Sequence, residues 1–328
     1  MRLDIIVPHY KEPWDVCAYL FDSIALQRGI FWGNVKVIVV NDGDCLIDEK
    51  NFEKYPYKVE YLVKEHGGVS AARNYGLDHS DADYVMFCDI DDGFLSNYGL
   101  HLVFSAMQEN LDYIYSNFVE ETFTAANTMT IVRHDRDFTF MHGKIYRRGF
   151  LVDNDIRFDP SMTLHEDGYF NTLALVVAQK NKKIKGIETP FYLWRWNDNS
   201  TVRKDREDFV LRTYENLMQT RIGACAQLKK RNYIEEYKTS VCLTVLNSYY
   251  DFQKPSYYTA KNEKHLRIAE KAFKKFWVLF GKDFKNCTNE MVAQIAQSAR
   301  KNACENGMLM ERQDIKTWLR HIENEVKV

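Results

Sequence analysis

The sequence has no long apolar run, because no segment approaches the roughly 18 uninterrupted apolar residues of a membrane-spanning helix. The first four residues lead directly into a strand-like segment, so no signal peptide is predicted. Cysteine is sparse and scattered: the seven residues are odd in number and form no Cys-x-x-Cys pair for zinc or redox chemistry. Together these absences predict a cytoplasmic protein with reduced cysteines, either soluble or peripheral at the inner membrane surface.

A change of composition near residue 204 predicts two domains. The chain has 328 residues, of which 45% are apolar and 14% aromatic, so it can bury a sizeable core. Residues 1–204 carry a net charge of −8, whereas residues 205–328 carry +6 and show long helical periodicities without strand patterns. We therefore expect an α/β domain over residues 1–204 and an α-helical domain over residues 205–328.

The first 92 residues alternate strand-like and helix-like segments. Apolar runs at residues 3–7, 35–40, 57–63 and 84–88 predict four strands, and apolar residues at helical spacing lie between the first two. The continuous Val/Ile run of the second strand is typical of a strand buried on both faces. This order predicts a mostly parallel sheet flanked by helices, with ligands bound by the polar loops at one edge.

Three carboxylates, those of Asp89, Asp91 and Asp92, crowd the end of the fourth strand. If the strand continues through them, Asp89 and Asp91 project to the same side and repel each other unless a cation or a sugar hydroxyl lies between them. Mg²⁺ and Mn²⁺ prefer oxygen ligands and are often held by one or two carboxylates together with nucleotide phosphates. The alternative is a solvated acidic turn, because Asp-Asp-Gly is also common in turns.

Over residues 1–203 the chain resembles family 2 glycosyltransferases, which have the nucleotide-sugar-binding fold called GT-A. The resemblance rests on six short segments in the family's order, none of which would suffice alone: Val7-Pro8-His9-Tyr10, Asn41-Asp42-Gly43, Ser70-Ala71-Ala72-Arg73-Asn74-Tyr75-Gly76, Asp89-Ile90-Asp91-Asp92, His142-Gly143-Lys144 and His165-Glu166-Asp167. It implies a GT-A catalytic domain that uses a UDP-sugar donor and Mn²⁺ or Mg²⁺. The Gln-x-x-Arg-Trp signature of processive members is absent, so we expect a nonprocessive enzyme.

The resemblance implies a role for each residue of the donor site. Tyr10 is similar to the aromatic residue that stacks on uracil, and Asp42 to the carboxylate that accepts the N3 hydrogen of uracil. Arg73 is similar to the positive contact near the base and phosphates. The structural alternatives are a packed loop aromatic, a turn aspartate and a surface arginine. The resemblance further implies Asp91 and Asp89 as metal ligands and the following donor contacts: Pro8, Glu12, Asp89, Ile90, Asp91, Lys144 and Arg195.

Two segments leave alternatives open. His142 and Lys144, in a loop before a strand, could reach the diphosphate, but such residues are more often exposed or bonded to a local backbone group. The segment around Arg195 resembles the aromatic-Arg segment that closes the active sites of the family, where either Arg195 or Arg203 could supply a positive charge.

The pair Glu166-Asp167 resembles the position of the catalytic base. The resemblance implies that Asp167 takes the proton from an acceptor hydroxyl, with Glu166 as the next candidate, and that one displacement inverts the anomeric configuration. Capping of the helix that follows is the structural alternative for both residues.

The helical tail contains one strongly amphipathic segment. Its apolar residues are Leu266, Ala269, Phe273, Phe276, Trp277 and Phe280, and its basic residues are Lys264, Arg267, Lys271, Lys274 and Lys275. We expect the apolar face to pack on the catalytic domain or on a second subunit in a homo-oligomer. The basic face is either solvated or contacts an anionic acceptor or surface: a polyol phosphate, a lipid-linked saccharide or glycan at a membrane, or a nucleic acid with a hydroxylated base.

The sequence argues against two functions other than glycosyl transfer. A sugar-nucleotide nucleotidyltransferase would carry a glycine-rich triphosphate loop near the first strand, and residues 8–13 contain no glycine. A UDP-sugar-binding protein without transfer activity would keep the nucleotide site alone, yet both Asp91 and Asp167 are retained.

Overall fold

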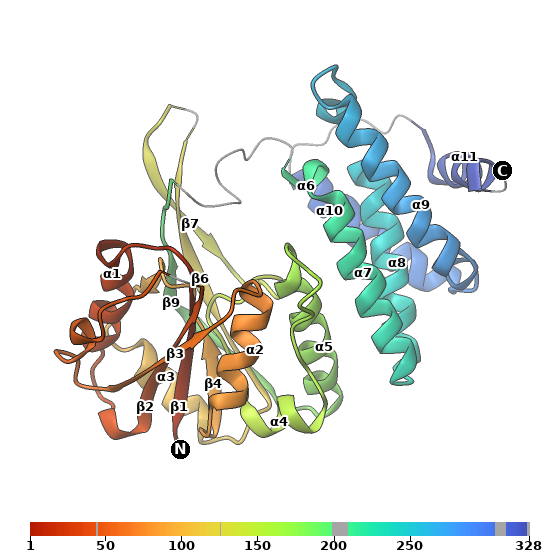
Figure 1. Ribbon diagram of the computed structural model, residues 1–328. Coiled ribbons are helices and arrows are strands. Elements are labelled where there is room, and N and C mark those ends of the chain that lie inside the picture. Colours follow the sequence, from red (N-terminus) through yellow and green to blue (C-terminus); the bar gives the residue numbers. More distant parts are fainter. Residues whose placement is uncertain (44, 125, 199–208, 306–312, 327–328) are drawn as a thin grey trace. The chain divides into compact units, whose positions relative to one another are not determined.

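The computed structural model describes residues 1–43, 45–124, 126–198, 209–305 and 313–326, which fall into two compact units (Figure 1). Unit 1 spans Met1–Arg203 and unit 2 spans Lys204–Val328. Unit 1 contains the β-sheet, and unit 2 is helical throughout the part that the structure describes.

Unit 1 is built on a nine-stranded sheet in the order β3-β2-β1-β4-β8-β6-β9-β5, with β7 paired to β6. The strands are β1 (Leu3–His9), β2 (Val35–Asp42), β3 (Lys58–Lys64), β4 (Tyr84–Phe87), β5 (Gly93–Phe94), β6 (Tyr113–Phe123), β7 (Met129–His134), β8 (Lys144–Arg147) and β9 (Ile184–Trp194). The helices are α1 (Trp14–Ala25), α2 (Val69–His79), α3 (Gly99–Met107), α4 (Arg148–Asp153) and α5 (Glu166–Lys180), and the 3-10 turns are η1 (Trp32–Asn34) and η2 (Glu49–Phe52).

The direction of the strands places many loops at one edge of the sheet. β1 to β4 pair in parallel, β8 runs antiparallel to both β4 and β6, and β9 runs parallel to β6. The carboxyl ends of β1 to β4 and of β9 therefore lie at the same edge as the amino end of β8. The predicted α/β class and the four parallel strands are confirmed. The sheet as a whole is mixed and not mostly parallel as predicted, because each antiparallel pair includes a strand after residue 92.

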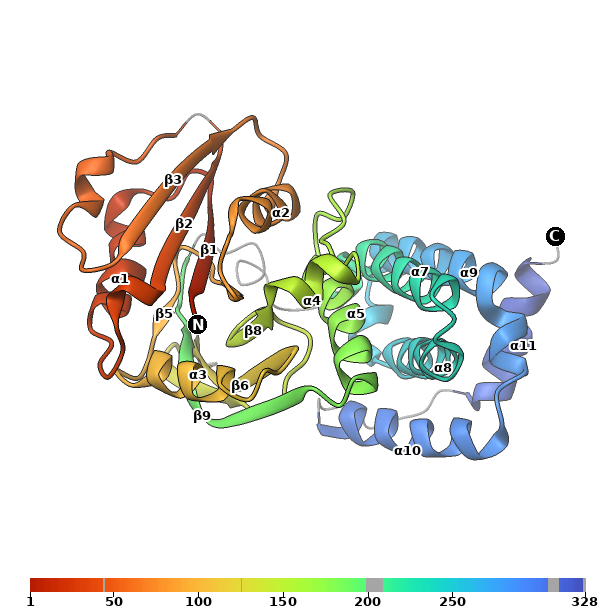
Figure 2. The ribbon, with the colours of Figure 1, turned by 90° about the horizontal axis from the view of Figure 1, so that it is seen from below.

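Helices cover both faces of the sheet, with α1 and α3 on one face and α2 and α5 on the other (Figure 2). Alternate residues of β1 explain this division, because Ile5 belongs to the core formed with α1 and α3 whereas Ile6 faces α2. A Cβ atom on Gly76 would lie 2.4 Å from Cγ2 of Ile6, so this glycine lets α2 pack directly on β1. The close packing fixes the helix that carries Arg73.

Unit 2 consists of helices that pack around an aromatic core. They are α6 (Phe209–Arg212), α7 (Tyr214–Lys230), α8 (Ile234–Asp251), α9 (Glu263–Lys285), α10 (Asn289–Glu305) and α11 (Ile315–Val326), with the 3-10 turn η3 (Pro255–Tyr258). Among the described residues, no helix combines the length and the apolar character that crossing a membrane requires.

The prediction for the apolar face of α9 is wrong. Phe273 packs on Trp318 of α11 with ring centres 4.8 Å apart, and Phe280 packs on Tyr237 of α8 with ring centres 6.1 Å apart. Because this face is covered by helices of its own unit, it is not the surface for a second subunit or for unit 1.

Candidate active site

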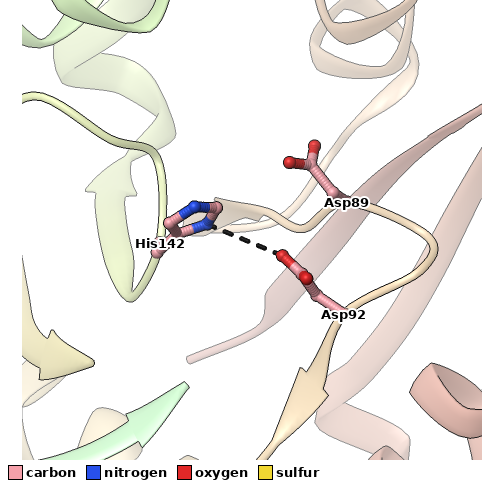
Figure 3. Close-up of side chains that lie close together, drawn as sticks. All are labelled: Asp89, Asp92 and His142. Carbon is pink, nitrogen blue, oxygen red and sulfur yellow. Dashed lines mark ion pairs between the residues drawn. The ribbon is translucent and has the colours of Figure 1, made fainter. Parts of the chain in front are cut away.

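The acidic segment after β4 forms a turn instead of a longer strand. β4 ends at Phe87, and the amide of Asp92 donates a hydrogen bond of 3.1 Å to the carbonyl of Asp89. The prediction that Asp89 and Asp91 share one side of a strand is therefore wrong. Asp89 and Asp92 come together with His142 so that one ligand atom from each lies within 4.8 Å of the others (Figure 3). Asp91 instead accepts a hydrogen bond of 2.7 Å from Asn197.

His142 is suited to hold a metal ion. Its Nδ1 lies 3.6 Å from Oδ2 of Asp92 and is a buried nitrogen without a hydrogen-bond partner. Burial lowers the pKa of His142 to about 3, so the imidazole is neutral and keeps a free nitrogen lone pair. Its ring stacks on Tyr192 with centres 4.9 Å apart. Two carboxylates and one imidazole suit Mn²⁺, which accepts both donor types, better than Mg²⁺.

The turn carries more negative charge than its surroundings neutralise. Burial, followed by repulsion from the neighbouring aspartates, raises the pKa of Asp91 and of Asp92. Asp92 accepts hydrogen bonds from the hydroxyl of Tyr192 at 2.6 Å and from the amide of Arg195 at 3.0 Å. These two bonds fix the carboxylate of Asp92 but supply no full positive charge. A divalent cation fits this charge excess.

Arg73 joins three carboxylates from two elements. Its Nη2 lies 2.8 Å from Asp89, and its Nη1 lies 2.9 Å from Glu166 and 2.6 Å from Asp167. Arg73 is only 3% exposed, which excludes the surface alternative. Both Nη atoms of Arg73 bind carboxylates in this structure.

Asp167 lies in the first turn of α5 and retains access to solvent. Burial, together with the negative charges of Glu166 and Asp89, raises its pKa to about 8 against the opposing effect of Arg73. Its side chain is 16% exposed. His165, the residue before α5, has the left-handed φ of 62° and turns the chain so that both acids reach Arg73. The capping alternative fails for the helix start, because His165 occupies the cap position.

Asn171 ties the loop before β8 to α5. Its amide nitrogen donates to the carbonyls of Thr139 at 2.9 Å and Phe140 at 3.1 Å, and its oxygen accepts from the hydroxyl of Tyr146 at 2.5 Å. The loop in turn presents the amide of Met141 to Oδ2 of Asp167 at 3.2 Å. Sequence reasoning missed Asn171; its position four residues after Asp167 on the same helix face was the available signal.

At the ends of β1 and β2, Asp42 is saturated with hydrogen-bond donors. Its Oδ1 accepts from Nζ of Lys64 at 2.5 Å and from the amide of Gly67 at 2.9 Å, and its Oδ2 accepts from the amide of Gly68 at 2.7 Å. Nδ1 of His66 also lies 2.9 Å from Oδ2. Burial alone would raise the pKa of Asp42, but the bonds from Lys64 and the two glycine amides outweigh it and lower the pKa.

Tyr10 lies beside Asp42. Its ring stacks on the imidazole of His66 with centres 4.4 Å apart and an angle of 22° between the planes. Nζ of Lys11 also lies 4.4 Å from the centre of the same ring. Tyr10 is 36% exposed, so it is accessible at the mouth of the site as the sequence predicted.

Glu12 and Pro8 shape the loop after β1. The carboxylate of Glu12 accepts hydrogen bonds from the amides of Tyr10 at 3.0 Å and Lys11 at 3.1 Å. Pro8 pairs with Val40 in the parallel register of β1 and β2. In this structure both residues therefore shape the loop that carries Tyr10.

Two of the remaining predicted donor contacts, Lys144 and Ile90, are buried. Lys144 is fully buried at the start of β8, where its Nζ donates to the carbonyl of His142 at 3.0 Å and burial lowers its pKa to about 8. This is the local backbone alternative, so Lys144 does not extend toward a diphosphate. The side chain of Ile90 is buried in the apolar core. The guanidinium of Arg195 lies 3.8 Å from the ring centre of Tyr19, and its Nη1 donates a hydrogen bond of 3.3 Å to the carbonyl of Asp91, so Arg195 lies at the acidic turn. Arg203 lies outside the described residues.

Comparison with protein families gives one match to this region. The sequence model described as "Glycosyl transferase family 2" matches residues 4–161. Five of the six sequence segments singled out above lie within this match, and the sixth, His165-Glu166-Asp167, follows it.

Three curated proteins illustrate the similarity. The minor teichoic acid biosynthesis protein GgaB of Bacillus subtilis is 36% identical over 94 residues, which are 27% of this chain and 10% of that protein. The uncharacterized glycosyltransferase EpsJ of the same organism is 25% identical, over 60% of this chain and 62% of that protein. The poly(ribitol-phosphate) beta-N-acetylglucosaminyltransferase TarS of Staphylococcus aureus is 24% identical, over 80% of this chain and 46% of that protein. The chain thus spans less than two thirds of the length of each.

Solved structures of S. aureus TarS share the fold. The crystal structure of TarS residues 1–349 has a TM-score of 0.59 at 18% identity and covers 92% of both chains. The structure of the same fragment in complex with UDP-GlcNAc has a TM-score of 0.58 with the same coverage. The predicted fold, a nucleotide-sugar-binding sheet followed by a helical region, is confirmed.

Proposed function

Through its residues 4–161 the chain belongs to glycosyl transferase family 2, and from this membership we propose that it transfers a sugar from a UDP-sugar to an acceptor hydroxyl. The reaction is nonprocessive and inverts the anomeric configuration. Residues 1–204 form the catalytic domain, and residues 205–328 position the acceptor or support an oligomer.

One observation carries this proposal: a candidate base and a candidate metal group gather around a single buried arginine. Arg73 contacts Asp167 on one side and Asp89 of the turn on the other, at 2.6 and 2.8 Å. A transferase needs a base near the acceptor and positive charge near the leaving diphosphate, and this arrangement offers a place for both.

The residues of the chain account for the proton and for orientation. Asp167 accepts the proton of the acceptor hydroxyl as its oxygen attacks the anomeric carbon, and the bond to UDP breaks on the opposite face. A single displacement converts an α-linked donor into a β-glycoside without a covalent intermediate. Arg73 and the amide of Met141 hold the carboxylate of Asp167 from two directions. Glu166, which shares Arg73, is the alternative base.

The metal group lies at the turn after β4. Asp89, Asp92 and His142 offer the ligand atoms, with Asp91 beside them to contact the ion or the donor. A bound Mn²⁺ or Mg²⁺ supplies positive charge for the leaving diphosphate. Asp42 and Tyr10 hold the uracil, since a carboxylate that accepts hydrogen bonds suits its N3 hydrogen.

The relatives suggest the sugar and the acceptor. TarS is named as a poly(ribitol-phosphate) beta-N-acetylglucosaminyltransferase, and GgaB as a minor teichoic acid biosynthesis protein. For this chain we accordingly propose UDP-N-acetylglucosamine as the donor and a hydroxyl of an anionic polyol phosphate as the acceptor. The reaction takes place in the cytoplasm, at the inner face of the membrane.

The first experiment is a donor panel. UDP-, GDP- and CMP-sugars are each added to the full chain with Mn²⁺ or with EDTA, and thermal stabilisation and slow donor hydrolysis are measured. The proposal expects stabilisation by one UDP-sugar that EDTA removes. A response to no nucleotide would overturn it. Binding of a UDP-sugar without hydrolysis or transfer would instead favour a binding protein, and release of pyrophosphate from a nucleoside triphosphate would favour a nucleotidyltransferase.

A further inference from the structure

The outward side of α9 combines lysines with exposed apolar residues. Lys264, Lys271, Lys275 and Lys282 recur at intervals of seven, four and seven residues, so they line one side of the helix over about 27 Å. On the same side, Ile268, Val278 and Leu279 are 38%, 65% and 55% exposed. We call these seven residues the α9 outer face.

The α9 outer face has positive charge that its surroundings leave largely uncompensated. Among the described residues, no carboxylate forms an ion pair with Lys264, Lys271 or Lys282. Lys275 is the exception, because its Nζ lies 3.3 Å from Glu215. Of the acids of α9, Asp283 accepts hydrogen bonds from Tyr237 and Lys229, and the charge of Lys282 also helps to lower its pKa.

We propose that the α9 outer face binds an anionic lipid surface. Lysine side chains can extend their charges to lipid phosphates while apolar side chains enter the boundary between headgroups and acyl chains. An anionic polymer would attract the lysines equally, but it offers nothing to cover Val278 and Leu279. The apolar residues therefore favour a lipid surface, and this deepens the location given in the proposed function.

Vesicle sedimentation tests this surface with the full chain. The wild type is expected to sediment with vesicles of phosphatidylcholine containing phosphatidylglycerol, but not with phosphatidylcholine alone. Each lysine near an anionic surface contributes about fivefold to binding, so the double variant Lys271→Gln, Lys282→Gln should lose about 25-fold. The double variant Val278→Gln, Leu279→Gln should also lose binding.

Two control variants separate this surface from general charge and hydrophobicity. Ile131→Gln with Val132→Gln removes two exposed apolar residues of β7 in unit 1, and Lys230→Gln removes an exposed lysine of α7. Neither is expected to change sedimentation. Loss in the lysine variant but not in the Val278, Leu279 variant would assign the surface to an anionic polymer and overturn the proposal. A dimer in sedimentation velocity that dissociates in the Val278, Leu279 variant would assign it to a second copy.

A separate observation concerns His66, which lies at the end of the site where the proposed function places the uracil. His66 makes the two contacts that the proposed function gives to uracil: its ring stacks on Tyr10, and its Nδ1 lies 2.9 Å from Oδ2 of Asp42. The same Nδ1 lies within hydrogen-bond distance, 3.0 Å, of the carbonyl oxygen of Asp42, while Lys64 and the amides of Gly67 and Gly68 donate to the carboxylate. The side chain of His66 is 57% exposed and lies in the loop after β3, two residues beyond the end of the strand, so it can move aside.

We infer that His66 occupies the base subsite of the free protein and that the nucleotide displaces it. This inference rests on the proposed function. Every nucleobase must displace the same side chain, so His66 weakens the binding of all nucleotides by one common factor. Asp42, in contrast, sets the preference among nucleotides. The same contact re-forms when UDP leaves and thereby favours product release.

Nucleotide titrations of variants test His66. His66→Ala is expected to tighten the binding of both UDP and CDP about three- to tenfold and to leave their ratio unchanged. His79→Ala is the matched control, because His79 packs on Tyr75 with ring centres 4.2 Å apart outside the site. In the free wild type, the ring protons of His66 should show an upfield NMR shift from Tyr10 that UDP removes.

The outcomes distinguish this inference from the proposed function. Unchanged or weaker UDP binding in His66→Ala, while the wild type binds UDP, would overturn the role of His66 alone. Failure of the wild type to bind any uridine nucleotide would overturn the proposed function as well.

Discussion

The two ends of the candidate site treat their carboxylates in opposite ways. At the base end, Asp42 is surrounded by donors, and its pKa is lowered. At the turn after β4, Asp91 and Asp92 lie close together with too little positive charge, and the pKa of each is raised. The difference indicates two roles. A carboxylate whose hydrogen-bond donors are in place is suited to recognise a ligand, whereas carboxylates that outnumber the nearby positive charges are suited to bind a cation or a proton.

The largest effect is expected at the proton acceptor. Asp167→Asn should lower the rate of transfer by about 10²- to 10⁴-fold, because the amide cannot accept the proton, while UDP binding stays nearly intact. The rate is measured with saturating donor, and donor affinity by calorimetry. Asp153→Asn, at an exposed position of α4, serves as the control. Full activity of Asp167→Asn would move the role of base to Glu166.

The charge excess at the turn predicts the next effect. His142→Ala and Asp91→Asn should each weaken Mn²⁺-dependent UDP binding by at least about tenfold, because even partners of metal ligands commonly contribute that much. Titration of Mn²⁺ by electron paramagnetic resonance, with and without UDP, measures the change. His101→Ala, which alters an exposed histidine of α3, is the control. If both variants bound Mn²⁺ with wild-type affinity, the turn after β4 would not be a cation site.

The raised pKa of Asp167 predicts a pH dependence. The base works as a carboxylate, so the turnover rate should increase with pH through about 8 and fall about tenfold for each pH unit below it. Turnover measured from pH 6 to 9.5 with saturating substrates tests the sign. The residual activity of Asp167→Asn should lack this dependence, and a flat wild-type profile would contradict the assignment.

The smallest effects are expected in stability, with opposite signs at the two ends. Asp42→Asn should lower the free energy of unfolding by about 1–3 kcal/mol, because an amide leaves one of the buried donors without an acceptor. Asp91→Asn should raise the melting temperature of the metal-free protein, since it removes a charge whose ionisation burial opposes. Chemical and thermal unfolding with EDTA measure both. If both variants changed the stability in the same direction, the contrast between the two ends of the site would be wrong.

Much of the fold was predictable because its signals are local. The Val/Ile runs of β1 and β2 and the helical periodicity of α9 depend only on neighbouring residues. The destination of the apolar face of α9 was not predictable, because helical periodicity shows that a face is buried but not which element covers it.

The candidate site was predictable in its residues but not in its contacts. Sequence indicated Asp42, Arg73, Asp89 and Asp167, yet it did not show that Arg73 would bind acids from two elements. Whether a strand ends at Phe87 or continues to Asp91 depends on pairing with strands that lie far away in sequence. The burial of Lys144 was not predictable for a similar reason, since burial at the start of β8 is set by tertiary packing.

The contacts of Arg73 also determine when the site can form during synthesis. Asp89 follows Arg73 by only 16 residues, but Glu166 follows it by 93, which the ribosome adds in roughly 5–20 s. Until Glu166 and Asp167 have been synthesised, the guanidinium of Arg73 can bind only Asp89 of its three carboxylate partners. Water solvates its remaining N–H groups. Attachment of α5 then replaces that water and buries the arginine. The candidate site is therefore completed late in folding, after the parallel half of the sheet has been synthesised.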